Sequence, residues 1–215
     1  GWAWGDGRNS ASFRTAHRVQ NYVELEAGGA EAFRAMIQDT LYSPYFWTVR
    51  LFKPSETKET EIYFDPKGDF IGFEEKVPED EEGGALSADS ALSIVHEQII
   101  QKWRFRLPSY ELIEKAQQVR PAGRIDHTFT YELKDQKIGE GTYRYEIGVS
   151  GDKLTKIKPY IKIPETFDLK YEELRSANET IATGAVIAIV LLYVFGGILF
   201  GLFYLLKQRW LVWKK

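Results

Sequence analysis

The sequence predicts an α+β protein with two units, each a helix followed by a three-stranded antiparallel sheet, and then one transmembrane helix. Three observations support this prediction. A run with helical periodicity followed by three strand-like runs occurs twice before residue 166. Short turns rich in Pro, Gly, Asp and Ser separate the strands, which favours antiparallel hairpins. From Thr180 to Leu206 the chain then has no charged residue.

The first unit is expected at residues 28–84. Its helix is predicted at Ala30–Leu41, where apolar residues recur at helical spacing. Three strands are predicted after it, at Phe46–Phe52, Glu59–Asp65 and Asp69–Lys76. The preceding residues 1–27 are predicted to be partial strands of a truncated unit, because Arg8–Leu25 alternates between polar and apolar residues.

The second unit is expected at residues 85–165. Its helix is predicted to begin near Ser87 and to run to Trp103, and a second short helix is predicted at Ser109–Gln118. Three strands are predicted at Ile125–Leu133, Gly141–Val149 and Lys153–Ile163. Because each unit is too small to bury its sheet alone, we expect the two units to pack together.

The apolar run Ile181–Leu206 predicts the transmembrane helix. At 1.5 Å per residue these residues would extend about 39 Å as a helix, more than the roughly 30 Å of membrane hydrocarbon. Residues 166–180 are expected to form a juxtamembrane linker or helix. Residues 207–215 are expected to be a basic cytoplasmic end, with Trp210 and Trp213 at the membrane interface.

Charge is distributed unevenly along the chain and predicts the orientation of this helix. The four basic residues after Leu206 are Lys207, Arg209, Lys214 and Lys215, and no acid accompanies them, whereas the first 180 residues have a net charge of −7. The positive-inside rule therefore predicts that residues 1–180 are extracytoplasmic and that the C-terminus is cytoplasmic. The acidic body argues against a nucleic-acid partner.

Few side chains in this chain suit catalysis or metal binding. The absence of cysteine excludes a disulfide scaffold, a thiol nucleophile and a cysteine-based zinc site. His96 is expected on a helix face with no second ligand at helical spacing. Asp126 and His127 are neighbours on a strand and so point to opposite faces. The acidic run at residues 79–82 ends in two glycines and is expected to be a solvated loop.

Gly197 and Gly201 form a Gly-x-x-x-Gly pattern within the apolar run. Small residues at this spacing allow a second helix to approach closely. The alternative is the ordinary frequency of glycine in membrane helices. If the pattern does mediate packing, we expect the partner to be another transmembrane helix of the same, longer protein.

Units of one helix and an antiparallel sheet resemble PepSY-like modules, which occur in exported parts of bacterial membrane proteins. A second and more specific resemblance rests on three segments and the apolar helix that follows them. The segments are GGAEAFRAMIQDTLYSPYFWTVRLF, GRIDHTFTYEL and IKIPETFDLKYEELRSANE. In this order they resemble the N-terminal region of bacterial CPBP-family intramembrane metalloproteases, the CAAX-protease and bacteriocin-processing group. The likeness covers nearly the whole chain, but only the part that precedes that family's catalytic domain.

The resemblance implies a protease of the bacterial inner membrane whose catalytic helices, and a divalent metal such as zinc, lie downstream of this chain. The family pattern is Glu-Glu-x-x-x-Arg followed by Phe-x-x-x-His and His-x-x-x-Asn/Asp. The paired glutamates at 74–75, 81–82 and 172–173 lack the arginine. Phe13, His17 and Asn21 fit the two histidine motifs. They lie, however, in a polar segment that precedes every paired glutamate, whereas the family's histidine motifs follow it on membrane helices. We therefore expect no catalytic, cofactor-binding or metal-binding residue in this chain.

Two functions remain open. In the first, the chain is the non-catalytic extracytoplasmic domain and first following membrane helix of such a protease, with the bilayer, downstream helices and a peptide or protein substrate as partners. In the second, it is a single-pass anchored binding or sensor module without enzymatic activity. The start at Gly1, the lack of an export signal and the ending RWLVWKK favour a fragment of a longer protein, and hence the first function.

Overall fold

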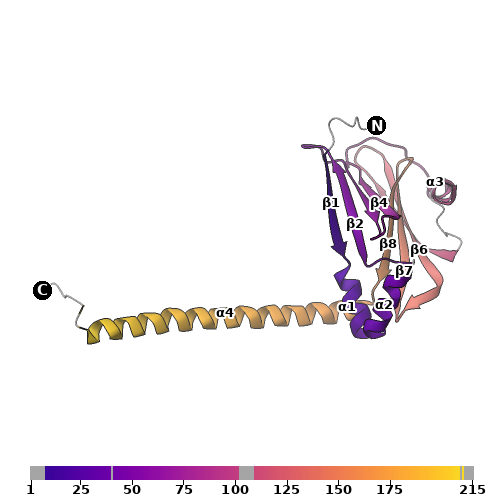
Figure 1. The fold of residues 1–215 in the computed structure, drawn as a ribbon. Coiled ribbons are helices and arrows are strands. Elements are labelled where there is room, and N and C mark those ends of the chain that lie inside the picture. The colour runs from indigo at the N-terminus through magenta and orange to yellow at the C-terminus, as the bar shows by residue number, and fades with distance from the viewer. Residues whose placement is uncertain (1–7, 40, 102–108, 209, 211–215) are drawn as a thin grey trace. The chain divides into compact units, whose positions relative to one another are not determined.

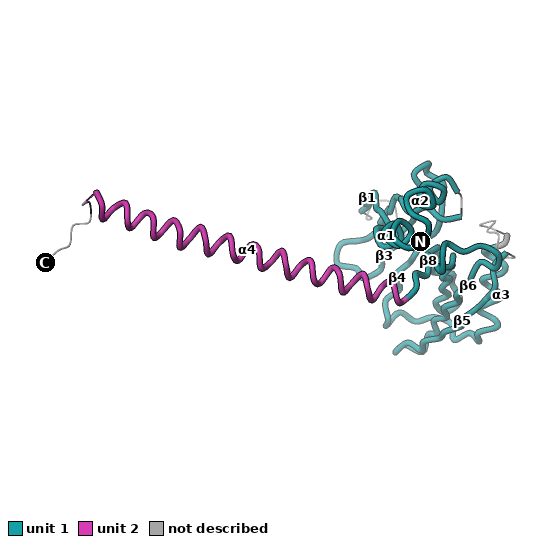
Figure 2. The backbone as a smooth tube through the Cα atoms, turned by 90° about the horizontal axis from the view of Figure 1, so that it is seen from below, with its two compact units in different colours: residues 1–164 teal, residues 165–215 magenta. Residues whose placement is uncertain are grey.

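The computed structural model describes residues 8–39, 41–101, 109–208 and 210. The chain divides into two compact units, residues 1–164 and residues 165–215, which are coloured separately in Figure 2.

The first unit contains one sheet of eight antiparallel strands. They are β1 (Arg8–Thr15), β2 (Tyr45–Phe52), β3 (Glu59–Phe64), β4 (Phe70–Lys76), β5 (Tyr110–Val119), β6 (Ile125–Ile138), β7 (Gly141–Ser150) and β8 (Lys153–Lys162). Their order in the sheet is β1-β2-β3-β4-β8-β7-β6-β5. The first four strands and the last four therefore form two halves that meet where β4 pairs with β8 (Figure 1).

The α+β class is confirmed, but the prediction of two separate three-stranded units is wrong. Strands β2–β4 and β6–β8 lie where the sequence predicts strands, and β1 and β5 add a fourth strand to each half. The last strand of each half would be an open edge in a separate sheet. Pairing β4 with β8 covers part of both edges and unites the halves in one sheet.

Two further local predictions are wrong. Arg8–Leu25 is not all strand, because β1 is followed by helix α1 (His17–Glu26). Ser109–Gln118 is not a helix: most of it lies in β5, which pairs with β6 along Tyr110–Val119. The residues of β5 favour a helix by intrinsic propensity, and the ladder to β6 overrides that preference.

The junction between the halves is narrow. Its paired positions are Phe73 with Ile157 and Glu74 with Lys156. Gly72 lies directly beside this pairing, where an added Cβ would collide with the backbone oxygen of Ile157. Glycine at position 72 is therefore what allows the two backbones to approach each other.

Helix α3 (Ala88–Gln101) covers one face of the second half of the sheet. Its residues Ala91, Val95 and Ile99 are buried at i, i+4 and i+8. They pack against strand residues that include Phe129, Tyr131, Ile147, Val149, Leu154 and Ile157. We call this side of the whole sheet the helix face.

The opposite side carries a ladder of charges across the junction. Lys156 lies 2.8 Å from Glu74 and 2.7 Å from Glu146, and Lys158 lies 2.9 Å from Glu74. Because neighbouring residues of a strand point to opposite faces, these charges alternate with the apolar residues of the helix face. We call this side the charged face.

Helix α1 and helix α2 (Gly29–Gln38) lie at one end of the sheet (Figure 1). The buried hydroxyl of Tyr22 donates to the carbonyl of Ile138 at 3.1 Å. The same oxygen accepts the backbone N–H groups of Glu140 and Gly141 at 3.0 and 2.9 Å. One tyrosine thus attaches α1 to the β6–β7 turn, more than 110 residues away in sequence.

The second unit contains helix α4 (Glu165–Lys207), a single helix of 43 residues. It runs without a break through the expected juxtamembrane segment and the apolar run, so residues 166–180 are helical. Its length is about 65 Å at 1.5 Å per residue. The helix is long and apolar enough to cross a membrane, and the side chains of its apolar part are exposed.

Candidate binding cavity

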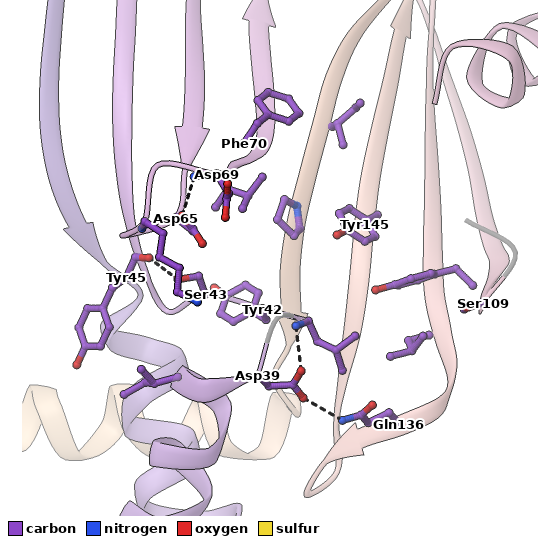
Figure 3. Close-up of a pocket in the computed structure, with 18 of the residues that line it drawn as sticks. Asp39, Tyr42, Ser43, Tyr45, Asp65, Asp69, Phe70, Ser109, Gln136 and Tyr145 are labelled. Atoms are coloured by element: carbon purple, nitrogen blue, oxygen red, sulfur yellow. Dashed lines mark hydrogen bonds between the residues drawn. The ribbon is translucent and has the colours of Figure 1, made fainter. Parts of the chain in front are cut away.

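A cavity of about 760 Å³ opens on the helix face of the first unit (Figure 3). Its boundary consists of the end of α2 and the loop that follows, the β3–β4 turn, and strands β4, β8, β7 and β6. Ile99 of α3 and Ser109 before β5 also line it. The residues between them, 102–108, lie outside the described part of the chain.

The floor of the cavity is apolar and comes from four adjacent strands. Ile71, Ile157, Ile147 and Leu133 line it, one each from β4, β8, β7 and β6. The register pairs Ile147 with Ile157 and places Phe73, two residues after Ile71, opposite Ile157. The alternation of the strands therefore brings these side chains onto one face.

Tyrosines form much of the wall. Tyr42 and Tyr45 come from the segment before and at the start of β2, and Tyr110 and Tyr145 come from β5 and β7. The rings of Tyr110 and Tyr145 meet edge to face with centroids 5.1 Å apart. Burial raises the pKa of Tyr42 to about 12, and burial also raises the pKa values of Tyr110 and Tyr145. Tyr42, Tyr110 and Tyr145 therefore present neutral hydroxyls at physiological pH.

The rim of the cavity is acidic. Asp39, Asp65, Asp69 and Asp135 line it, and Lys67 is the basic residue among the lining side chains that the structure describes. The four carboxylates come from three separate segments, namely the end of α2, the β3–β4 turn and β6.

Two of these carboxylates hold local structure. Asp65 Oδ1 accepts the backbone N–H groups of Lys67 and Asp69, both at 2.8 Å, which fixes the β3–β4 turn. Asp39 Oδ1 accepts the N–H of Leu41 at 3.3 Å, and Asp39 Oδ2 lies 3.5 Å from Nε2 of Gln136. Both contacts of Asp39 are drawn in Figure 3.

The other two carboxylates face solvent. Asp69 and Asp135 are exposed, and their carboxylate oxygens take part in none of the hydrogen bonds or ion pairs recorded among the described residues. They are therefore the rim charges most available to a ligand.

The histidines considered in the sequence lie elsewhere. His127 is buried, its Nε2 lies 2.8 Å from the carbonyl oxygen of Leu86, and its ring stacks on Phe129. His96 Nε2 lies 3.4 Å from the hydroxyl of Tyr131, and His17 begins α1. The described residues contain no group of three His, Asp or Glu side chains arranged to hold a metal ion.

The apolar floor and the acidic rim of the cavity together suit the binding of an apolar group beneath an acidic mouth.

The residues that the sequence predicts for helix packing and for the membrane interface belong to the second unit. Gly197 and Gly201 lie on α4, where an added Cβ would meet open space, and Lys207 is its last residue. The backbone N–H of Trp210 donates to the carbonyl of Leu205 at 3.1 Å. Arg209, Trp213, Lys214 and Lys215 lie outside the described residues. Helix packing at the two glycines and the membrane orientation stay predictions from the sequence.

Sequence reasoning missed the cavity. Its floor residues have the alternation of ordinary core strands, and nothing in that alternation distinguishes a packed face from an open one. Pro66 and Gly68 predict a turn between the strands at Glu59–Asp65 and Asp69–Lys76. The sequence does not predict that the aspartates of this turn share a cavity rim with Asp39 and Asp135.

Comparisons with models of protein families, with curated proteins and with solved structures found no match for this chain. The resemblance to CPBP-family proteases and PepSY-like modules therefore stays a prediction from the sequence.

Proposed function

We propose that this chain is a membrane-anchored binding module whose cavity takes up apolar side chains of a peptide or protein. One observation carries the proposal: a cavity of about 760 Å³ with an apolar floor and tyrosine walls lies on the sheet. Sites for small ligands are typically concave, mostly apolar and about 300–1,000 Å³ in volume. The convergent polar groups at its rim provide orientation.

The membrane part of the proposal rests on α4. The length and composition of this helix suit a membrane span, and the bilayer is its proposed partner. The basic residues that follow Leu206 support an extracytoplasmic body and a cytoplasmic C-terminus.

The chain lacks cysteine, so a single introduced cysteine can report on the cavity. Gln136 lines the cavity and its side chain is exposed, which makes Gln136→Cys suitable for attaching acrylodan, an environment-sensitive fluorophore. The full chain is placed in phosphatidylcholine nanodiscs and titrated with a neutral hexapeptide of alternating phenylalanine and serine, acetylated and amidated. We expect a saturable blue shift.

The matched control places the same label at Asp80→Cys, an exposed position on the acidic loop away from the cavity lining. The emission wavelength of the label at position 80 is expected not to change when the peptide is added. Equal shifts at both positions would indicate binding to lipid or to the general surface, and no saturable shift at position 136 would contradict the proposal.

A second function follows from the segments that resemble the N-terminal region of CPBP-family proteases. In that case the module holds substrate beside catalytic helices encoded downstream, the divalent metal belongs to those helices, and Gly197 and Gly201 pack against one of them. Reading the downstream open reading frame tests it. Further apolar segments with Glu-Glu-x-x-x-Arg and later histidine motifs would support this function, whereas an immediate stop codon would exclude it.

A further inference from the structure

We infer that the cavity selects basic peptide segments in which arginine or lysine alternates with large apolar side chains. This inference rests on the proposed binding function and names the chemistry of its ligand. Three features carry it: the charge of the rim, the aromatic walls and the dimensions of the floor.

The rim distinguishes between ligands by charge. Four aspartates and one lysine surround the mouth, so the rim repels acidic groups and attracts basic ones. The carboxylates come from three segments that the fold brings together, and a cation at the mouth is therefore approached from more than one side. The side chains of Asp69 and Asp135 can reorient toward it, because the hydrogen bonds that fix the β3–β4 turn use the backbone of Asp69 and not its carboxylate.

The walls add to this preference. Tyrosine rings attract ammonium and guanidinium groups through the negative charge of their π faces. Tyr42, Tyr45, Tyr110 and Tyr145 line the same cavity as the rim aspartates and the floor isoleucines. A long basic side chain can therefore place its aliphatic part along a ring and its charge at the rim.

The floor has the width of an extended peptide segment. It spans β4, β8, β7 and β6, and three spacings of about 4.8 Å between strands amount to roughly 14 Å. Alternate residues of an extended peptide recur about every 6.8 Å. Two or three apolar side chains of one peptide can thus span the floor, while the intervening basic residues remain at the mouth.

The test compares three hexapeptides of identical spacing, in which phenylalanine alternates with arginine, serine or glutamate. Binding is measured with the acrylodan label at Gln136→Cys in the full chain, in phosphatidylcholine nanodiscs at low salt. We expect the arginine peptide to bind at least tenfold more tightly than the glutamate peptide, with the serine peptide between them. The preference is expected to shrink at 1 M salt, where the screening length falls to about 3 Å.

Two double variants test whether the preference for basic peptides comes from the charges of the cavity rim. Asp69→Asn with Asp135→Asn removes two rim charges, and we expect about fivefold weaker binding of the arginine peptide, because each exposed ion pair contributes only modestly. Binding of the serine peptide should not change. Asp80→Asn with Glu82→Gln removes two exposed charges outside the cavity lining and should affect neither peptide.

The outcomes separate this inference from the proposed function. If the serine peptide binds but the arginine peptide binds no more tightly, the binding function stands and the basic preference is wrong. If none of the peptides gives a saturable shift, both are wrong. Tighter binding of dodecylamine than of the arginine peptide would assign the cavity to a cationic amphiphile and overturn the peptide assignment.

Discussion

Arg124 is a buried cation that joins the acidic loop to the sheet. Its side chain is only 2% exposed, and Nε lies 2.8 Å from Asp126. Its Nη1 donates to the backbone carbonyl of Glu81 at 2.6 Å. Arg124 thus fixes the loop that connects the two halves of the sheet. Neither Arg124 nor Glu81 lines the cavity.

Replacing this arginine should cost stability. Arg124→Ala leaves the nearly buried Asp126 with Arg120 as its remaining ion-pair partner, and breaking a buried ion pair typically costs 3–5 kcal/mol. We expect a loss of about 3 kcal/mol in the free energy of unfolding, measured by urea denaturation followed by circular dichroism. Arg175→Ala, on an exposed pair with Glu179, should cost less than about 0.5 kcal/mol. Equal losses for the two variants would contradict this assignment.

The same ion pair predicts a pH dependence. Burial alone would raise the pKa of Asp126, but hydrogen bonds from Arg124 and Arg120 hold it below its usual value. Lys156 and Lys158 lower the pKa of Glu74 in the same way, against its burial. A carboxyl whose pKa is lowered in the folded state stabilises the fold above its unfolded pKa and loses that contribution as pH falls through the folded value.

The unfolded pKa values of Asp and Glu lie near 3.9 and 4.3. We therefore expect this contribution to the free energy of unfolding to be complete by about pH 6 and to decline below about pH 4. Asp126→Asn should lower stability at pH 7 and weaken the dependence on acid pH. An unchanged acid dependence in this variant would show that the Arg124–Asp126 pair contributes nothing to it.

At the scale of elements, the β4–β8 pairing decides whether the chain has one sheet or two. An added Cβ at Gly72 would collide with backbone, which cannot rotate away as a side chain can. Gly72→Ala should destabilise the first unit by about 2 kcal/mol, in the range found for overpacked sites. Hydrogen exchange at the amides of β4 and β8 should increase most. Gly184→Ala, where the added Cβ meets open space, should be neutral or slightly stabilising.

How far the sequence predicts this fold depends on the range of the interactions involved. The periodicity of β2–β4 and β6–β8 is local, so their positions were predictable. The pairing of Phe73 with Ile157 joins residues that are 84 positions apart, and no local pattern encodes it. The strand conformation of β5 depends on its partner β6 in the same way. The cavity exists only after these long-range pairings have formed.

At the scale of the whole molecule, the proposed orientation can be tested by labelling. A single cysteine at Asp80→Cys, in bacteria that produce the full chain, should react with a maleimide that does not cross the membrane. The physical reason is the excess of basic residues after the apolar run, which by the positive-inside rule favours a cytoplasmic location for that end. A matched cysteine at Gln208→Cys should react only after the cells are opened. The reverse pattern would invert the proposed topology.

Helix α4 continues without a break from its polar part into the apolar run. Residues 166–180 and the apolar run belong to one helix, so the polar part extends roughly 22 Å beyond the apolar segment. The helix is therefore continuous from Glu165 to the end of the apolar run.

The central claim is that the cavity on the helix face binds peptide, and photo-crosslinking tests it most directly. An arginine–phenylalanine hexapeptide with one benzoylphenylalanine is irradiated with the full chain in nanodiscs, and the modified residues are identified by mass spectrometry. The account predicts crosslinks to the cavity lining, at residues such as Ile71, Leu133 and Tyr145, which excess unlabelled arginine peptide removes. Competable crosslinks confined to the charged face or to the edge strands β1 and β5 would contradict it.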